Sequence, residues 1–369
     1  MKLKYCSECL MPNTKPNLNF LDGICNTCHY YRNYKFTKGK INWNLRKKQF
    51  SYLIKKIKKM KAPLFDALVP VSGGKDSIFQ VDRLLNKKLR ILAVNIDYGF
   101  KTEIGISNLN NISKMGATLM TVRPNLKTHS KILKISFLKY GDPDLMSHCM
   151  LHAFPIRVAL DLKIPLALLG ENSAIEYSGS IEKYDPKRMT NMWFKKYAAS
   201  FDITPKVFSK KHNINYGLLK NYDLPSDYEL KKINPVFSSY FYKWNSQTNL
   251  KIAKKHGFKT LKKPGEGTYR NYVGIDEKIK RIHQYLKYLK FGYGRATDHV
   301  CEDIRNKKLD RNLGKKIIIK HDRSPISKYY YKEFIDFIGI NEKNFFKTLK
   351  KFTNKDLFNI KGNEFILKN

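Results

Sequence analysis

A run of small, charged and hydroxyl-bearing residues, Ser72 to Ser77, has the composition of a phosphate-binding loop. It reads SGGKDS and lies between an apolar stretch, DALVPV, and a helical pattern, IFQVDRLLNK. Gly73 and Gly74 let the backbone approach a phosphate closely, and the start of the following helix offers unpaired N–H groups and a positive dipole end. Because Lys75 is followed by Asp76 instead of Ser or Thr, the loop is not a Walker A sequence. We expect it to bind phosphate.

Four of the six cysteines form two matched pairs near the N-terminus. Cys6 and Cys9 make one C-x-x-C, Cys25 and Cys28 make another, and fifteen residues separate the pairs. This spacing is typical of a Zn²⁺ ion bound by four thiolates. A redox dithiol or a sulfur-handling site is the alternative, but the segment lacks an apolar core, which favours a metal that orders it. A closed site has no open position, so we expect a structural role, with His29 as a bystander.

Polar residues also follow two predicted strands. Asp97 comes after LRILAVNI, and Gly170, Glu171 and Asn172 come after IPLALL. Ligands of open α/β sheets bind at the carboxyl ends of the strands. We therefore expect Glu171 to complete a metal or substrate site, while Asp97 fits a ligand contact or a strand-terminal turn almost equally well.

Cys149 stands apart from the other cysteines, in the segment SHCMLH. His148 is adjacent and His152 is three residues on, so a lone nucleophile or a residue beside the substrate is one interpretation. A buried structural cysteine near a helix start is the more common situation, and we favour it.

The elements that must position these residues follow from the apolar periodicity. From Phe65 the order strand, turn, helix, strand predicts a right-handed parallel unit, and further strands over TLMTV and PLALL extend it to a doubly wound parallel sheet. Beyond residue 250 the pattern becomes helical. We predict four parts: a four-cysteine zinc-ribbon-like module (1–42), a linking helix (43–64), the α/β domain (65–250) and a mainly helical C-terminal region for substrate or partner binding (251–369).

Composition adds a broad constraint on partners and location. The 369 residues carry a formal net charge of +40, from 58 lysines and 13 arginines against 31 acidic residues. The lysines are scattered and arginines are few, so the charge predicts an anionic partner or substrate without favouring nucleic acid. No stretch of eighteen apolar residues and no N-terminal cleavage pattern occurs, so we expect a soluble cytoplasmic protein without a membrane partner.

The loop resembles the SGGxDS signature of the PP-loop ATP pyrophosphatases, whose fold is adenine nucleotide alpha hydrolase-like. The resemblance implies that ATP is split between its α- and β-phosphates. Residues 95–99 would seat adenine and ribose, with Asp97 and Gly170 at the nucleotide, and Lys75, Asp76 and Glu171 would be catalytic. Asp76 would help to place Mg²⁺. The residues implied to hold the β- and γ-phosphates are Ser72, Gly73, Gly74, Lys75, Asp76 and Ser77.

Over nearly its whole length the chain resembles the N-acetyl sugar amidotransferases of bacterial surface-polysaccharide and flagellar-glycan pathways. The motifs that carry the resemblance are the two cysteine pairs, VSGGKDS, SHCM, LLGEN and FGYGRATDHVCEDIRN. The family is associated with turning an acetamido group of a sugar into an acetamidino group: ATP adenylates the acetamido oxygen, ammonia displaces AMP, and pyrophosphate is released. The acceptor would be a sugar, a sugar nucleotide or a nonulosonic acid, and the cofactors would be ATP, Mg²⁺ and structural Zn²⁺.

The resemblance also implies a partner. No glutaminase motif occurs in the chain, so a separate glutaminase subunit, as in the glutaminase/cyclase pair of imidazole-glycerol-phosphate synthase, would supply ammonia, or free ammonia would be used. The residues implied to bind the acceptor are Asn172, Cys149, Arg295, Asp298 and His299. Together with Glu302 and Asp303, the last three fall mostly at helical spacings of three and four, so a solvated, salt-bridged helix face is the alternative.

Two other functions remain open at the level of sequence. A tRNA-modifying PP-loop enzyme of the thiolase type would also adenylate a carbonyl oxygen, but it typically has a second cysteine pair after the loop, and Cys149 has no near partner. A zinc-bearing RNA-binding protein with a degenerate ATP site would not need Lys75 and Asp76.

Overall fold

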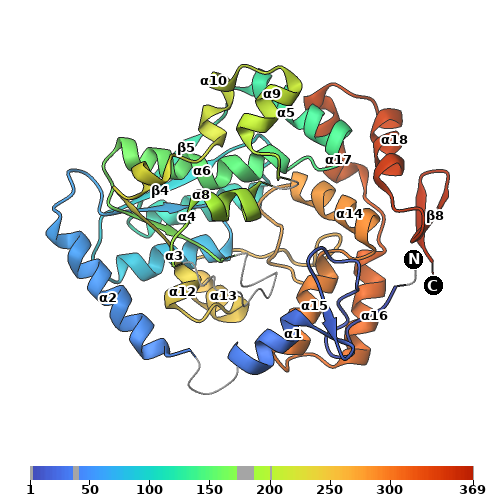
Figure 1. The fold of residues 1–369 in the computed structure, drawn as a ribbon, viewed down its shortest axis with the longest axis horizontal. Coiled ribbons are helices and arrows are strands. Elements are labelled where there is room, and N and C mark those ends of the chain that lie inside the picture. Colours follow the sequence, from blue (N-terminus) through green and yellow to red (C-terminus); the bar gives the residue numbers. More distant parts are fainter. Residues whose placement is uncertain (1–2, 36–40, 173–186, 200–201, 369) are drawn as a thin grey trace.

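A five-stranded parallel sheet forms the centre of this computed structural model (Figure 1). The structure describes residues 3–35, 41–172, 187–199 and 202–368. The strand order is β5-β4-β3-β6-β7, and every pair of neighbours is parallel. The doubly wound α/β class predicted from the sequence is confirmed. The strands are β3 (Ala67–Pro70), β4 (Ile91–Ile96), β5 (Thr118–Val122), β6 (Leu166–Leu169) and β7 (Asn234–Phe237).

Alternate strand residues point into two hydrophobic cores on opposite faces of the sheet. Leu68 and Leu92 belong to one core, and their neighbours Val69 and Ala93 belong to the other. Because both faces are covered, the strands read as continuous apolar runs. The Val69 face is covered by α2 (Trp43–Lys59), α3 (Lys75–Leu85), α4 (Glu103–Lys114), α12 (Ser238–Phe241) and α13 (Ser246–Lys255); the Leu68 face is covered by α5 (Leu126–Ile135) and α6 (Leu145–Asp161).

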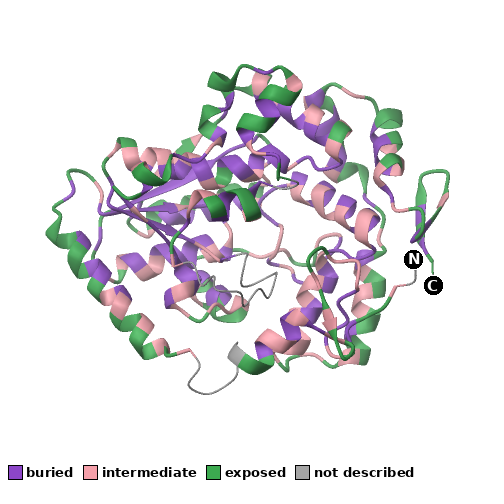
Figure 2. Ribbon diagram, in the orientation of Figure 1, coloured by how far each residue is buried: buried purple, intermediate pink, exposed green. Residues whose placement is uncertain are grey.

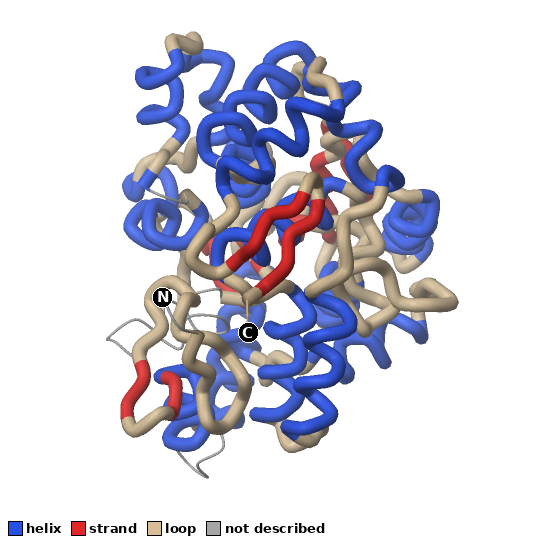
Figure 3. The backbone as a smooth tube through the Cα atoms, turned by 90° about the vertical axis from the view of Figure 1, so that its right-hand side faces the viewer, coloured by secondary structure: helices blue, strands red, loops and turns tan. Residues whose placement is uncertain are grey.

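Three of the C-terminal helices, over residues 279–291, 328–338 and 342–352, share the Leu68 core, and buried residues are purple in Figure 2. Phe334 and Phe345 are completely buried there beside Phe137, which follows α5. The predicted helical C-terminal region is confirmed, and it also contains a hairpin, which faces the viewer in Figure 3. The elements are α14 (Ile279–Phe291), α15 (Arg295–Arg305), α16 (Arg311–Asp322), α17 (Lys328–Ile338), α18 (Glu342–Phe352), β8 (Phe358–Lys361) and β9 (Glu364–Leu367).

The predicted division into four parts stays a prediction. Its boundary at residue 250 falls inside α13, which packs on α3. Residues 36–40 and 173–186, within the first and third parts, lie outside the described residues. Between β6 and β7 the described residues include four short α-helices: α8 (Asn191–Trp193), α9 (Pro205–His212), α10 (Tyr216–Leu219) and α11 (Asp227–Leu230).

The N-terminal module is small and lies against α15 and α16 (Figure 1). It has a two-stranded hairpin, β1 (Phe20–Leu21) with β2 (Ile24–Cys25), followed by α1 (Asn26–Tyr30). Its apolar residues Leu10 and Met11 form a third core with Val300 of α15. The module therefore depends on the C-terminal helices for its packing.

Candidate active site

The SGGKDS loop joins the carboxyl end of β3 to the N-terminus of α3, as the sequence predicts. Gly74 is the N-cap of α3, and Gly73 has a φ of +90°. A Cβ at Gly73 would lie 2.7 Å from the carbonyl oxygen of Gly105, so only glycine fits between the loop and α4. The Ser72 N–H donates to Ser77 Oγ over 3.0 Å and thereby closes the loop on itself. The N–H groups of the first turn of α3 form an anion site of the kind expected at a helix N-terminus.

Lys75, which is buried, and Asp76, which is partly exposed, form an ion pair at the start of α3. Lys75 Nζ lies 2.5 Å from Asp76 Oδ2, and Asn249 Nδ2 of α13 donates to Asp76 Oδ1 over 2.8 Å. Burial lowers the pKa of Lys75, but the Asp76 carboxylate, with a smaller contribution from Glu171, outweighs it and raises that pKa above its ordinary value. Lys75 is therefore a permanent positive charge beside the loop.

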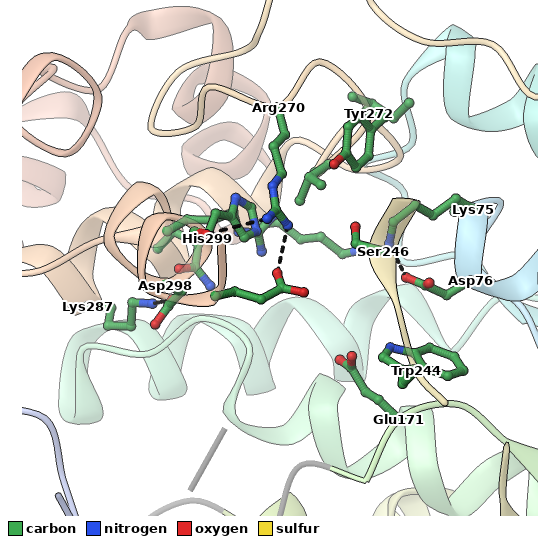
Figure 4. Close-up of a pocket in the computed structure, with 18 of the residues that line it drawn as sticks. Lys75, Asp76, Glu171, Trp244, Ser246, Arg270, Tyr272, Lys287, Asp298 and His299 are labelled. Carbon is green, nitrogen blue, oxygen red and sulfur yellow. Dashed lines mark hydrogen bonds and ion pairs between the residues drawn. The ribbon is translucent and has the colours of Figure 1, made fainter. Parts of the chain in front are cut away.

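The loop forms one side of a pocket with a volume of about 580 Å³, a size typical of small-molecule sites. Ser72, Gly74, Lys75 and Asp76 line this side. In Figure 4, Lys287, Asp298 and His299 lie on the opposite side, and the Glu171 carboxylate points into the space between them. Strand β3 is the middle strand, with β4 on one side and β6 on the other, so the strand order reverses beside β3. The pocket lies at this switch point, where α/β folds bind ligands.

The three residues after β6 have different positions. Glu171 lines the pocket, whereas Gly170 and Asn172 are not among the lining residues. Asn172 is 1% exposed; its N–H donates to Ser239 Oγ over 3.0 Å, and its Oδ1 accepts from Trp193 Nε1 over 2.9 Å. The amide of Asn172 thus holds the chain after β6 against the neighbouring helices.

Asp97 ends β4 in a turn and does not line the pocket. Its Oδ1 accepts the Gly99 N–H over 2.9 Å, and its Oδ2 accepts from Arg123 Nε over 2.8 Å. Burial raises the pKa of Asp97, but the Gly99 N–H and Arg123 together outweigh burial and bring that pKa below its ordinary value. The geometry corresponds to the strand-terminal turn considered for this residue.

Cys149 lies within α6, is completely buried, and does not line the pocket. Its thiol donates to the carbonyl oxygen of Ala198 over 3.7 Å. Burial raises the pKa of the thiol well above its ordinary value, so the thiolate needed for nucleophilic chemistry is disfavoured.

Helix α15 presents Arg295, Asp298, His299 and Glu302 to the pocket. Asp298 pairs with Lys287 of α14, and His299 Nδ1 lies 3.3 Å from Thr268 Oγ1. Burial, with the charges of neighbouring arginines, holds the pKa of His299 well below its ordinary value, so its ring is neutral at neutral pH. The helical spacing read from the sequence therefore does bring Arg295, Asp298 and His299 to one face, and that face lies across the pocket from the Ser72–Ser77 loop.

The segment before α14 supplies lining residues that sequence reasoning missed. Arg270, 5% exposed, pairs with Glu302 at 2.8 Å and with Asp303 at 2.9 Å, and so ties this segment to α15. The only sequence signal for this segment, EGTYRNYVG, was its two glycines, Gly267 and Gly274, which both adopt a positive φ. The missed lining residues include Trp244, Ser246, Arg270, Tyr272, Asp276, Lys280, Gln284 and Lys287.

Helix α15 is capped by a residue of the next helix. The Asp322 carboxylate, 2% exposed, accepts the N–H groups of Gly294 over 2.8 Å, Ala296 over 2.9 Å and Thr297 over 3.1 Å. These bonds satisfy the donors that a helix start leaves unpaired. They fix the end of α15 that carries Arg295.

The four N-terminal cysteines converge on one point. All four are buried, and their sulfur atoms lie within 4.8 Å of one another. The Sγ–Sγ distances are 3.8 Å for Cys6–Cys28 and 3.7 Å for Cys9–Cys25. Zn–S bonds of about 2.3 Å in a tetrahedron require sulfur atoms about 3.8 Å apart, so the cluster fits Zn²⁺. The Cys25 N–H also donates to Cys6 Sγ over 3.3 Å, as backbone amides do to metal-bound thiolates.

No helix in the described part of the chain is long and apolar enough to cross a membrane.

Comparison with known proteins gives a match for the last part of the chain. Residues 266–368 match the family model described as the C-terminal domain of WbpG-like LPS biosynthesis proteins. No curated protein matches the sequence. Among solved structures, the NMN synthetase from Francisella tularensis is similar, with 12% identity, 61% of this chain and 99% of that chain covered, and a TM-score of 0.28. At so low a score, the fold class rests on the strand order.

Proposed function

We propose that the chain is an ATP-dependent amidotransferase acting on an N-acetyl sugar, free, nucleotide-linked or in a nonulosonic acid. The acetamido oxygen attacks the α-phosphorus of ATP, and pyrophosphate leaves. Ammonia then adds to the O-adenylyl imidate, AMP departs with the oxygen, and loss of a proton gives the acetamidino sugar. A glutaminase subunit supplies the ammonia, and the reaction belongs to surface-glycan synthesis in the cytoplasm.

One observation carries this proposal: a single pocket has the PP-loop on one side and the polar face of α15 on the other. With pyrophosphate in the loop, the α-phosphorus would lie in the pocket that the α15 side also lines. Arg295, Asp298 and His299 would then hold the sugar. The match of residues 266–368 to a lipopolysaccharide-biosynthesis domain supports a sugar acceptor, because that segment contains α15.

The loop side supplies the electrostatic part of the reaction. Lys75 and the first N–H groups of α3 stabilise the charge that develops on pyrophosphate. Asp76 and Glu171 line the loop side of the pocket and would hold Mg²⁺, which usually binds one or two carboxylates together with the phosphates of its substrate. Bound Mg²⁺ would neutralise charge on the phosphates.

The thiolase-type alternative is less well supported. It requires a cysteine that delivers sulfur, and among the residues that line the pocket there is none. Cys301 donates its S–H to the backbone of the N-terminal module, and Cys149 is enclosed within α6 and its neighbours.

The test is a reconstitution with purified full-length protein, ATP, Mg²⁺, an ammonium salt and a panel of N-acetyl sugars. We expect AMP and pyrophosphate to form only when both ammonia and the correct sugar are present. Mass spectrometry should show the sugar after exchange of oxygen for NH. Formation of ADP and orthophosphate as the only nucleotide products would exclude the proposal, and turnover that requires tRNA would favour the alternative.

A further inference from the structure

The N-terminal module also forms part of the pocket wall. Met11, Lys15 and Tyr31 line the same pocket as Lys75 of the PP-loop. The module is therefore more than a distant stabilising element, since its own side chains face the space opposite the loop.

Two C-terminal helices hold the first cysteine pair of the module. The Cys301 thiol of α15 donates to the carbonyl oxygen of Cys9 over 2.5 Å, and Arg311 Nη2 of α16 donates to the carbonyl oxygen of Cys6 over 3.0 Å. Arg305 Nη1, at the end of α15, donates to Cys9 Sγ over 3.4 Å. The cysteine cluster and α15 are thus joined through both backbone and sulfur atoms.

Arg305 lies where the cluster, the module and the pocket meet. Its guanidinium carbon is 5.0 Å from the centre of the Tyr31 ring, and the residue itself lines the pocket. A guanidinium pairs well with a thiolate held by a metal and can stack on an aromatic ring at the same time. The Arg305 side chain therefore connects α15, which carries it, to a sulfur atom of the cysteine cluster.

We propose that metal loading of the four cysteines fixes α15 against the pocket, and that Arg305 is the positioning residue that couples the two. The module has few apolar residues of its own, so its folding should depend on the metal, as it does in other small metal-binding modules. The Cys9 contacts of Arg305 and Cys301 would then be lost. This coupling goes beyond the proposed function, because it does not depend on which ligand the pocket binds.

The PP-loop side has separate supports. Gly73 packs on α4 through Gly105, and Asp76 is held by Asn249 of α13. Both supports belong to the α/β core, whereas the four cysteines pack in a separate core with α15 and α16. Metal removal should consequently disturb the α15 side and leave ATP binding intact.

Hydrogen–deuterium exchange of the full-length protein tests the coupling with and without Zn²⁺. After chelation, with metal loss measured by elemental analysis, we expect the amides of α15 to exchange at least about tenfold faster while those of α3 are unchanged. ATP affinity measured by calorimetry should stay within about threefold, and added Zn²⁺ should restore α15. Unchanged exchange in α15, or equal loss of protection in α3, would overturn the proposal.

Variants at Arg305 test the same coupling in the metal-loaded protein. Arg305→Met should retain one Zn²⁺ per chain yet accelerate exchange in α15, with Arg305→Lys intermediate. Asp22→Asn, in the exposed turn between β1 and β2, is the control within the same module and should behave as the parent protein. If Arg305→Met leaves α15 protected as in the parent, the coupling does not exist. Because exchange needs no sugar, this outcome is independent of whether the amidotransfer assay succeeds.

Discussion

The close approach of the phosphate loop to α4 can be tested with Gly73→Ala. At Gly73, φ is +90°, and an added Cβ would lie 2.7 Å from Gly105 O and 3.2 Å from Leu109 N. Gly116 is a matched control, because its φ is +104° and an added Cβ would have no described atom within 4 Å. It is exposed and follows α4, outside the pocket lining. The two variants share the backbone strain and differ in the contact.

The expected effects follow from these two terms. A positive φ costs a non-glycine residue about 1–2 kcal/mol, which should be the whole effect of Gly116→Ala. Gly73→Ala adds an overpacked contact with backbone atoms that cannot rotate away, typically about 1–3 kcal/mol more. Relief of that contact requires the loop to move by roughly half an ångström. Since this loop carries the phosphate-binding N–H groups, kcat/KM for ATP should fall about ten- to a hundredfold in Gly73→Ala alone.

Urea unfolding measures the stability of both variants, and calorimetric titration with ATP measures binding independently of the acceptor. The parent protein and Gly116→Ala should bind ATP equally, whereas Gly73→Ala should bind it more weakly. Equal losses of stability with equal ATP affinity in the two variants would refute the argument that this glycine is required by the packing against α4.

Three further substitutions probe other parts of the site. Lys75→Met should lower the rate of AMP release by about 10²–10³-fold, because it removes a fixed charge beside the leaving phosphates, while the unfolding midpoint changes little. Asp322→Ala should lower the free energy of unfolding by about 2–4 kcal/mol in urea titrations, since it leaves buried N–H groups of α15 unpaired; a loss below 0.5 kcal/mol would contradict its capping role. Burial lowers the pKa of His283, but Asp142, 2.8 Å away, outweighs it and raises that pKa above its ordinary 6.5. The pKa of Asp142 is in turn lowered from 3.8 to about 2. The pair therefore stabilises the fold fully between about pH 4 and pH 6.5 and less as pH rises through the raised pKa of His283, so the difference in Tm between parent and His283→Gln should shrink at alkaline pH.

The local features of the site were predictable because each depends on a short run of sequence. The loop from Ser72 to Ser77, the strands on either side of α3 and the spacing of the cysteine pairs are all local patterns. Strand β7 was not predicted, since it is only four residues long and contains Pro235. That proline is tolerated because β7 is an edge strand, and only the sheet order reveals this.

The opposite side of the pocket could be predicted only in part. The three-and-four spacing in α15 indicated which side chains share a face, but what that face meets depends on tertiary packing. Arg270 is an example, because its carboxylate partners Glu302 and Asp303 lie more than thirty residues away along the chain. Likewise, the shared core of Phe137 with Phe334 joins segments that no local pattern connects.

The contact between Cys9 and Cys301 joins positions 292 residues apart. During synthesis the N-terminal end leaves the ribosome first, so the cysteine cluster exists long before the helices that enclose it. In the nascent chain its four thiols are open to solvent, to oxidants and to competing metals. Early binding of a Zn²⁺ ion, or a reducing environment, would protect these thiols until the last third of the polypeptide has been made.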